Sequence, residues 1–431
     1  MDTSLLAWYL APAAALMAFY VWRRRRSESG HARELAGSIA AGLTEPPSLH
    51  PVVDPLRCIG SGGCVRACPE KALGIVDGRA TLVSPASCIG HGACEATCPV
   101  QAITLVFGTE RRGVDIPRVD PHFETNVRGV FIAGELGGMG LIRKASEQGR
   151  QAIRTIASRP RTSAPLDVLI VGAGPAGIAA GLAAIDAKLR YRLIEQEPDL
   201  GGSVFHYPRH KIAMTQPVEL PVVGTMRFTE VSKEALLAFW RRIVGGTGLA
   251  IHYSERFEQL ERQGGVFRVV TSRGSYDAGQ VLLAIGRRGT PRKLGVEGEE
   301  LPKVVYRLVD PAQYRGQHVL VVGGGDSAVE AALACVSEQD TEVTLAYRGE
   351  AFNRIKAANR ERLEAARAQG SLDVLTSTDV ARIAPDHVVL VAAGAERRVR
   401  NDRVIVQAGG ILPTELLRSI GIEVETKFGS A

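Results

Sequence analysis

The stretch from Asp167 to Ala184, DVLIVGAGPAGIAAGLAA, decides the fold of most of this chain. A run of apolar, mostly β-branched residues meets G-A-G-P-A-G and is followed by small helix-forming residues. This order predicts a buried strand, a tight turn and a helix. In such a turn Gly172 reverses the chain, Gly174 lets the backbone approach a pyrophosphate, and Gly177 lets the helix pack on the strand.

The residues that follow this turn fit a dinucleotide site. The helix begins with Pro175 and Ala176, and a helix N-terminus stabilises phosphate charge. The next strand, YRLIE, ends at Glu195, where a carboxylate can bind a ribose hydroxyl. Gly202, in the Gly-Gly pair that comes next, is expected to wrap the dinucleotide as in flavoproteins.

A second unit of the same kind reads HVLVVGGGDSAVEAALAC over residues 318–335. Here Gly323 and Gly325 take the first two glycine roles, and Asp326 and Ser327 open the helix beside the expected phosphates. We therefore predict a second nucleotide site.

The strand after this second turn carries Tyr347 where the first unit has a carboxylate, and Arg348 and Arg354 follow. A 2′-phosphate is repelled by a carboxylate and held by guanidinium groups. The second site therefore favours NADPH over NADH.

Six of the seven cysteines lie in two copies of one template, CIGSGGCVRACP from Cys58 and CIGHGACEATCP from Cys88. Zinc usually takes two separated Cys-x2-Cys pairs, and neither copy contains one, so iron–sulfur binding is favoured over a structural zinc. Residues 52–108 resemble a two-cluster bacterial ferredoxin, whose run is C-x2-C-x2-C-x3-C-P and whose fourth cysteine binds the other cluster.

That resemblance implies two ligand sets, one of Cys58, Cys64 and Cys98 and one of Cys88, Cys94 and Cys68. The second cysteine of each run is replaced, by Ser61 in the first and by His91 in the second. Each site is therefore open to a three-iron cluster, or to a four-iron cluster closed by the serine, the imidazole or a water.

Two dinucleotide turns about 150 residues apart are the layout of flavoproteins with two dinucleotide-binding domains. Together with GGGDSAVE, the segment AIGRRGTP, with its hinge at Gly286, resembles the low-molecular-weight thioredoxin reductase superfamily over about 290–310 residues. The second domain contains Cys335 but no Cys-x2-Cys. The resemblance is therefore to the branch of ferredoxin–NADP reductases and bacillithiol-disulfide-reductase-like proteins, and it implies FAD in the first domain and a possible homodimer.

That superfamily normally closes its FAD domain with a C-terminal strand and turn of the type T-x-V-x-G-V-F-A-A-G-D. The present chain ends in VETKFGSA, but TNVRGVFIAGELGG occurs at residues 125–138, before the flavin turn. The resemblance implies a circular permutation, in which Gly134 and Glu135 take the place of the Gly-Asp pair that contacts the flavin.

The N-terminus contains an uncharged stretch at residues 5–22, followed by four arginines at 23–26. This stretch is just long enough to span a bilayer, and aromatic residues lie near both of its ends. The positive-inside rule would place the rest of the chain in the cytoplasm. We therefore predict a single-pass anchor in the cytoplasmic membrane, with the catalytic part facing the cytoplasm.

Composition excludes several other classes of protein. The 431 residues are 45% hydrophobic and 23% charged, which is typical of a folded chain rather than a disordered one. The formal net charge of +6 owes much to the four consecutive arginines, and no extended basic face is visible. Nucleic acid is therefore not expected as a partner. Clustered cysteines in a long chain also argue against a disulfide framework.

The predicted fold class is α/β: two Rossmann-like three-layer dinucleotide-binding domains, with a circularly permuted FAD domain, plus a small α+β ferredoxin-like domain and one transmembrane helix. The predicted boundaries are 1–26 for the anchor with its basic stop, 27–51 for a linker, 52–108 for the ferredoxin-type domain, 113–160 for the permuted closing segment, 165–288 for the FAD-binding domain, 289–410 for the NADPH-binding domain, and 411–431 for a tail returning to the FAD domain.

These motifs predict a membrane-anchored, NAD(P)H-dependent flavoprotein oxidoreductase that passes electrons between NADPH, FAD and two iron–sulfur clusters, 4Fe-4S or 3Fe-4S. Because the cofactors carry the chemistry, no side chain is assigned as a catalytic acid or base. The acceptor, a membrane redox partner or a quinone, and the direction of flow stay open. Two alternatives remain: a flavin-dependent thiol/disulfide reductase with accessory clusters, and an iron–sulfur redox sensor with residual catalysis.

Overall fold

The computed structural model describes residues 3–46, 49–88, 90, 92–110, 113–138, 140–207, 209, 211–287, 290–352, 355–411 and 413–429. The chain divides into two compact units. The first consists of residues 1–114 with 353–357 and 427–431, and the second of residues 115–352 and 358–426.

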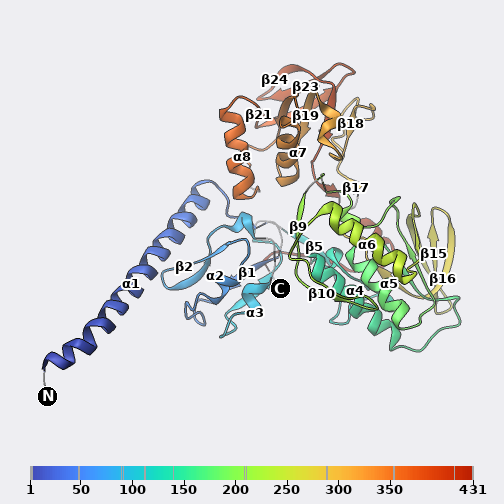
Figure 1. Cartoon of the computed structure of the whole chain (residues 1–431). Coiled ribbons are helices and arrows are strands. Elements are labelled where there is room, and N and C mark those ends of the chain that lie inside the picture. The colour runs from blue at the N-terminus through green and yellow to red at the C-terminus, as the bar shows by residue number, and fades with distance from the viewer. Residues whose placement is uncertain are drawn as a thin grey trace. The chain divides into compact units, whose positions relative to one another are not determined.

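The first unit joins a long helix, α1 (Thr3–Ala40), to a small α+β module (Figure 1). Its four strands pair antiparallel as β1 (His50–Val53) with β4 (Ile103–Val106) and as β2 (Leu73–Val76) with β3 (Arg79–Leu82). Two short helices, α2 (Gly63–Ala67) and α3 (Ala93–Ala96), each hold the middle cysteine of one run, and a 3₁₀ turn, η1 (Pro85–Ser87), precedes the second run. Apolar side chains of these strands share one core with four cysteines, Cys58, Cys64, Cys94 and Cys98.

Helix α1 overturns the prediction of a membrane anchor. Within the part of the chain that the structure describes, no helix has both the length and the apolar character needed to cross a membrane. The physical reason lies in the helix itself: the four arginines at 23–26 do not end it, since it continues to Ala40 through further charged residues. The predicted transmembrane helix with its basic stop and the predicted single-pass location in the cytoplasmic membrane are therefore wrong.

The first half of the second unit is built on a mixed sheet. Its strands are ordered β13-β8-β7-β16-β15-β14, and β6 pairs with the end of β16. Their bounds are β6 (Val130–Ile132), β7 (Leu166–Val171), β8 (Tyr191–Ile194), β13 (Ile251–His252), β14 (Phe257–Gln263), β15 (Val266–Thr271) and β16 (Gly274–Leu283). Strands β6, β16, β7, β8 and β13 run parallel, so their carboxyl ends lie at one edge, where ligands bind in open α/β sheets.

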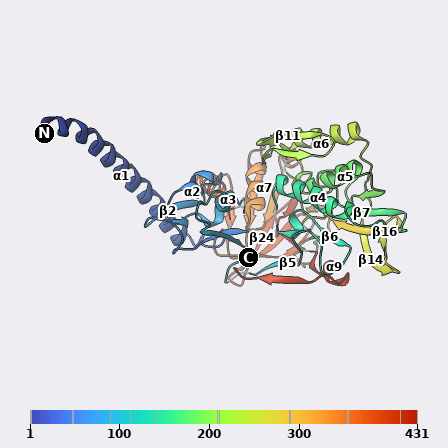
Figure 2. The same ribbon diagram turned by 90° about the horizontal axis from the view of Figure 1, so that it is seen from below.

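Two helices pack together beside this sheet, α4 (Ile142–Ala157) and α5 (Pro175–Asp186) (Figure 2). Helix α5 consists almost wholly of alanine, glycine and other apolar residues, and most of it is buried. Small side chains let the two helix backbones approach closely. As a result, α4, which precedes the first glycine turn in the sequence, is packed against the helix that this turn begins.

The other half of the second unit has a five-stranded parallel sheet in the order β18-β25-β19-β20-β21. Its strands are β18 (Val304–Val305), β19 (His318–Val322), β20 (Glu342–Ala346), β21 (Asp373–Leu375) and β25 (Arg403–Val406). Helix α7 (Asp326–Val336) follows β19, and a three-stranded meander of β22 (Thr378–Ile383), β23 (His387–Ala392) and β24 (Ala395–Arg400) shares the core of this sheet.

The remaining elements are helices α6 (Lys233–Thr247), α8 (Ala357–Ala368) and α9 (Thr414–Ser419), 3₁₀ turns η2 (Glu135–Gly137), η3 (Gly202–Val204) and η4 (Pro311–Tyr314), and strands β5 (Val114–Pro117), β9 (Ile212–Met214), β10 (Val218–Leu220), β11 (Gly224–Met226), β12 (Glu230–Ser232), β17 (Thr290–Pro291), β26 (Gly410–Ile411) and β27 (Val424–Lys427). Strand β27 pairs with β5, and Leu417 and Ile422 pack in the same core as Ile132. The segment from Leu417 to Ile422 therefore packs against the first of the two sheets.

Candidate functional site

The first glycine turn leaves space for a ligand at one position and closes it at another. A Cβ added to Gly177 would lie 1.7 Å from the carbonyl oxygen of Gly172, so helix α5 and the turn are in direct backbone contact. At Gly174 the nearest neighbour of such a Cβ is the Cα of Gly202, at 3.7 Å. Backbone without side chains on both sides forms a cradle that a pyrophosphate fits and that a larger residue would fill.

Glu195 lies at the end of β8, beside this turn. Its side chain is buried, and its carboxylate accepts the backbone N–H groups of Ala173 at 2.6 Å and of Glu197 at 3.0 Å. Burial raises the pKa of Glu195, while these hydrogen bonds act in the opposite direction. A carboxylate fixed in this way keeps lone pairs for further donors, as ribose hydroxyls would be.

The segment that precedes the first glycine turn in the sequence enters the same sheet. In the parallel pairing of β6 with β16, Val130 lies opposite Val281 and Ile132 opposite Leu283. The backbone N–H of Ala133 donates to the carbonyl oxygen of Leu283 at 3.1 Å. The chain then leaves β6 at the carboxyl edge of the sheet, where the first glycine turn also stands.

Gly134 and Glu135 follow directly at that edge. The N–H of Gly134 donates to Oε1 of Gln148 at 2.8 Å, and Oε2 of Glu135 accepts from Oγ of Ser203 at 3.5 Å. A Cβ on Gly286 would lie 3.9 Å from the same Glu135 oxygen. The structure thus brings together the ends of three segments that sequence reasoning had assigned to the flavin. It adds Gln148, which no motif had indicated.

The second glycine turn also has one open and one closed position, and in addition an aromatic ring packs on it. A Cβ on Gly325 would meet no atom within 4 Å, whereas one on Gly323 would lie 2.4 Å from the carbonyl oxygen of Gln407. A Cβ on Gly324 would lie 2.2 Å from the ring of Tyr347. Tyr347 therefore packs directly on the turn, and its ring also lies 5.2 Å from that of Phe352.

Polar residues of this second site lie at the start of α7 and just after β20. Asp326 opens α7 with Ser327, and its Oδ1 accepts from Nδ2 of Asn359 at 2.7 Å. Arg348 is exposed just after the carboxyl end of β20, where a 2′-phosphate would be expected. Arg354 lies outside the described residues. Asn359 is a residue that sequence reasoning missed.

The cysteines of the first unit form two groups. Burial raises the pKa of Cys64, and the charges of Cys58 and Cys98 raise it further. Burial also raises the pKa of Cys94 to about 11, together with the charges of Cys88 and Cys68. Each thiol is therefore influenced by the two cysteines that the ferredoxin resemblance had grouped with it.

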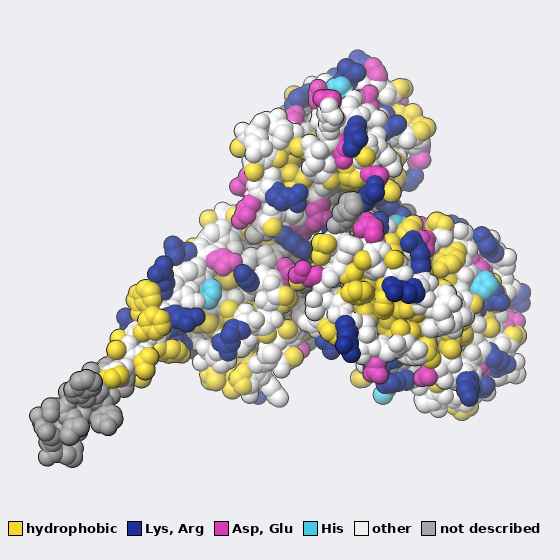
Figure 3. Space-filling model, viewed as in Figure 1, with side chains coloured by type: hydrophobic (Ala, Val, Ile, Leu, Met, Phe, Trp, Pro, Cys, Tyr) yellow, Lys and Arg dark blue, Asp and Glu magenta, His cyan; other side chains and the backbone are white. Residues whose placement is uncertain are grey.

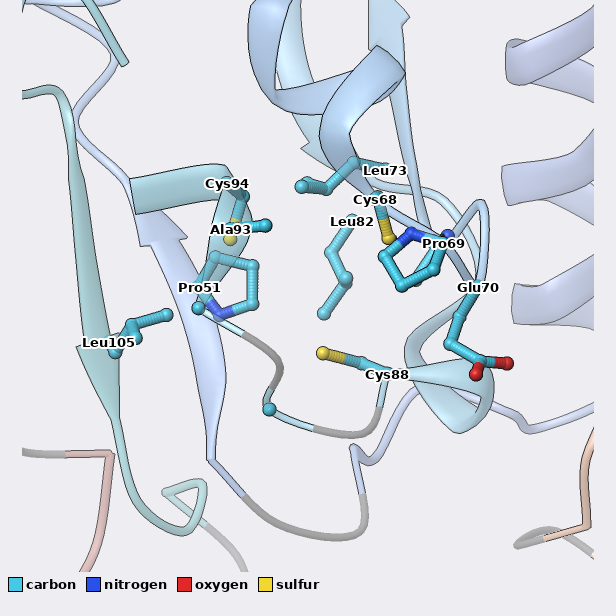
Figure 4. A pocket seen from close by; sticks show the side chains of 13 residues that line it. Pro51, Cys68, Pro69, Glu70, Leu73, Leu82, Cys88, Ala93, Cys94 and Leu105 are labelled. Carbon is cyan, nitrogen blue, oxygen red and sulfur yellow. Dashed lines mark hydrogen bonds between the residues drawn. The ribbon is translucent and has the colours of Figure 1, made fainter. Parts of the chain in front are cut away.

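The second group lines one cavity, together with apolar residues that include Leu73, Leu82 and Leu105. The sulfurs of Cys68, Cys88 and Cys94 face this space (Figure 4). Soft thiolate donors in an apolar surrounding are the chemistry that an iron–sulfur cluster requires.

Backbone N–H groups point at the sulfurs of both groups. They come from Ala80 to Cys58 at 3.4 Å, from Ala72 to Cys68 at 3.4 Å, and from Ala102 to Cys98 at 3.2 Å. Among the described residues no three metal-binding side chains are close enough to hold a single ion. A cluster does not need that spacing, because each of its thiolates binds a different iron. Ser61 is exposed, and His91 lies outside the described residues.

Two further side chains bear on the alternatives. Cys335 is fully buried in α7, and burial raises the pKa of its thiol to about 12. His206, in the loop after Gly202, lies 2.7 Å from Nη1 of Arg307 and 3.2 Å from the carboxylate of Glu197. Its ring is thus engaged with charged groups of the second unit.

Comparison with known proteins agrees with this architecture. A family described as pyridine nucleotide-disulphide oxidoreductase matches residues 169–429, and a 4Fe-4S dicluster domain matches residues 50–99. A ferredoxin–NADP reductase of Thermus thermophilus is 33% identical over 271 residues, which are 60% of this chain and 77% of that protein. The bacilliredoxin reductase Bdr of Bacillus subtilis is 27% identical over 61% of this chain and 82% of that protein.

Among solved structures, the bacillithiol disulfide reductase Bdr of Staphylococcus aureus superimposes with a TM-score of 0.53 at 25% identity, over 60% of this chain and 80% of that one. The corresponding protein of Bacillus cereus gives 0.53 at 26% identity. The family match covers more than half of the chain and includes both glycine turns. The chain therefore belongs to the pyridine nucleotide-disulphide oxidoreductase family, and it is a flavoprotein oxidoreductase with a 4Fe-4S ferredoxin-like domain.

Proposed function

We propose that this chain transfers electrons between NADPH, FAD and two iron–sulfur clusters. One polypeptide would then combine a reductase with a ferredoxin-like electron carrier. The observation that carries the proposal is a cavity that the sulfurs of Cys68, Cys88 and Cys94 face, in a chain that also has two nucleotide cradles. Ferredoxin–NADP reductases, by their name, act with a ferredoxin; here a ferredoxin-like domain belongs to the same chain.

The first cradle suits FAD. Gly172 and Gly174 would border the pyrophosphate, and Gly177 would keep helix α5 against the turn. Glu195 would bind a ribose hydroxyl, and Glu135 with Gly286 would lie by the rest of the cofactor. Bound flavin supplies the conversion between two-electron hydride transfer and one-electron transfer. We also infer a circular permutation of this domain, because β6 closes the sheet from a position ahead of the flavin turn in the sequence.

The second cradle suits NADPH. Tyr347 replaces the carboxylate that would repel a 2′-phosphate, and the exposed guanidinium of Arg348 follows it. Gly325 leaves the backbone open to the pyrophosphate, Gly323 fits the turn against Gln407, and the N-terminus of α7 would stabilise the phosphate charge. The two cysteine groups, with Ser61 and His91 as candidate fourth ligands, would hold the clusters.

The thiol/disulfide reductase alternative is less well supported. Outside residues 58–98 the sequence has one cysteine, Cys335, and its side chain is fully buried. A buried thiol with a pKa of about 12 is a poor nucleophile, since the thiolate is the reactive form. We expect Cys335→Ala to keep NADPH-dependent flavin reduction intact.

An anaerobic titration of the full-length protein with NADPH, followed by absorbance and EPR, tests the proposal. The expected result is bleaching of the flavin and then the appearance of iron–sulfur signals in the same sample. Flavin bleaching with clusters that stay oxidised would refute the proposed electron path. The redox-sensor alternative would then be preferred if partner binding changed when the clusters were lost in air.

A further inference from the structure

One face of α1 is turned toward the iron–sulfur module of the first unit. Arg24, His31 and Ser38 are spaced seven residues apart, which places them along one side of a helix. Oγ of Ser38 is buried and donates to the carbonyl oxygen of Val83 at 2.8 Å. Nδ1 of His31 accepts the backbone N–H of Ile75 at 3.0 Å. The second half of α1 is therefore part of this module.

The contact between α1 and β2 is close. A Cβ added to Gly74 would lie 2.6 Å from Cγ of His31, so no larger residue fits between helix and strand. Apolar residues in the first half of α1, among them Leu16, Met17 and Phe19, are exposed instead. Figure 3 shows apolar side chains on the surface of this part of the helix. Because the helix is continuous, its anchoring at His31 also fixes the position of Arg24, two turns earlier.

Arg24 lies against the loop of the first cysteine run. A Cβ built on Gly60 would lie 3.6 Å from Nη2 of Arg24, and Gly60 stands between Cys58 and Ser61 in the sequence. A second guanidinium, that of Arg66, donates to the carbonyl oxygen of Ser61 from both terminal nitrogens at 3.5 Å. The first cysteine loop thus has two positive charges beside it.

One negative charge partly offsets them. Glu28 accepts from Nε of Arg24 at 3.2 Å, and the Arg24 side chain is 46% exposed. The nearest charged atom to the Cβ position of Gly60 is still Nη2 of Arg24, so the charge nearest to this part of the loop is positive.

The second cysteine run has the opposite charge pattern. In the shared template, Val65 and Arg66 of the first run correspond to Glu95 and Ala96 of the second. Glu70 lines the cavity of the second group, and its charge contributes to the raised pKa of Cys88. The two otherwise similar cysteine loops are therefore electrostatically unequal.

We propose that Arg24 on α1, with Arg66, selectively raises the reduction potential of the cluster held by Cys58, Cys64 and Cys98. Reduction adds negative charge to a cluster, and nearby positive charge stabilises that state. Transfer of one electron from the second cluster to the first oxidises the second cluster and reduces the first. The equilibrium of this transfer is biased toward the reduced first cluster. This inference rests on the proposed function, because both clusters have to be present.

The test is a redox titration of the full-length protein with both clusters, followed by EPR. Arg24→Gln is compared with Arg25→Gln, which removes the same charge from a different side of α1, where Arg25 lies with Met17 and Val21. Ser61→Cys identifies the signal of the first cluster by altering it. We expect Arg24→Gln to lower the equilibrium constant for electron transfer from the second cluster to the first about tenfold. This corresponds to a reduction potential of the first cluster that is lower by about 59 mV for a one-electron couple.

Arg24→Lys should restore most of the potential, because it keeps the charge. Equal midpoints in the Arg24→Gln and Arg25→Gln proteins, or equal shifts of both clusters, would overturn the inference while leaving the proposed electron path intact. Iron and sulfide contents too low for two clusters in the unmodified protein would instead refute the two-cluster function, and this inference with it. Circular dichroism checks that α1 stays helical in each variant.

Discussion

A Cβ added to Gly149 of α4 would lie 2.0 Å from the carbonyl oxygen of Ala176 in α5. Ala176 belongs to the first glycine turn, and Gly149 belongs to the segment that precedes this turn in the sequence. Oγ of Ser146, one helical turn before Gly149, is 3.4 Å from the carbonyl oxygen of Pro175. The flavin turn is therefore held in place by a helix from the segment ahead of it.

This contact predicts that Gly149→Ala destabilises the protein and lowers its flavin content. Neither backbone can move without disturbing the turn, and overpacking of this kind costs about 1–3 kcal/mol. Thermal unfolding and the ratio of flavin to protein absorbance measure the two effects. Gly245→Ala in α6 is the matched control, because a Cβ there meets no atom within 4 Å. Identical melting behaviour of the two variants would contradict the role of the α4–α5 contact.

The second glycines of the two turns allow a reciprocal experiment. A Cβ at Gly174 or at Gly325 makes no close contact with the rest of the fold, so we expect a valine at either position to act mainly by blocking the approach of a phosphate. We expect Gly174→Val to yield protein without FAD, and Gly325→Val to keep FAD but to lose NADPH binding. Flavin absorbance and the KM for NADPH measure these losses, and each variant is the control for the other. FAD retained by Gly174→Val would refute the assignment of the first turn.

The choice between NADPH and NADH is predicted to depend on Arg348. A guanidinium hydrogen bond to a phosphate contributes about 1.5–3 kcal/mol. Arg348→Ala should therefore raise the KM for NADPH by roughly ten- to a hundredfold and leave that for NADH nearly unchanged. Steady-state kinetics with both nucleotides are the measurement, and Arg397→Ala on β24 removes an exposed arginine as a control. A parallel loss with both nucleotides would show that Arg348 does not read the 2′-phosphate.

An ion pair at the start of β7 predicts part of the acid sensitivity of the FAD domain. Asp167 is buried and accepts from Nη2 of Arg190 at 2.6 Å and from the Arg190 backbone N–H at 2.8 Å. The hydrogen bond from the Arg190 side chain is the main cause that holds the pKa of Asp167 below its usual value. The stabilisation is therefore fully present above the ordinary aspartate pKa and is lost as the pH falls through the lowered one.

Asp167→Asn should lower the free energy of unfolding at neutral pH by about 1–2 kcal/mol, since Arg190 is half exposed and its charge is screened. Denaturant unfolding of the flavin-free protein at pH 7 and pH 3 measures the difference, which should shrink at the lower pH. Glu258→Gln breaks an exposed pair in the same domain and should cost less than about 0.5 kcal/mol. A pH-independent loss in Asp167→Asn would contradict the ion-pair explanation.

The glycine turns could be predicted from the sequence because their geometry is local: a strand, three glycines and a helix within 20 residues determine the backbone path. The cysteine groups were predicted from the resemblance of the repeated run to two-cluster ferredoxins, whose fourth cysteine binds the other cluster. The contacts of α1 could not be predicted in this way, because they are made with residues far away in the sequence. An apolar run followed by arginines was interpreted as a membrane span, whereas Arg24, His31 and Ser38 acquire meaning only when the strand opposite them is known. Tyr347 on Gly324 and Gln148 on Gly134 are contacts of the same long-range kind.

The pairing of Val130 with Val281 has a consequence for how the protein is made. Strand β6 leaves the ribosome about 150 residues before β16, the strand that completes its hydrogen bonds. At synthesis rates of about 5–20 residues per second, β6 waits roughly 8–30 seconds with an unpaired apolar edge. During that interval the nascent chain exposes an apolar strand edge, and such unpaired edges are where chains associate with one another.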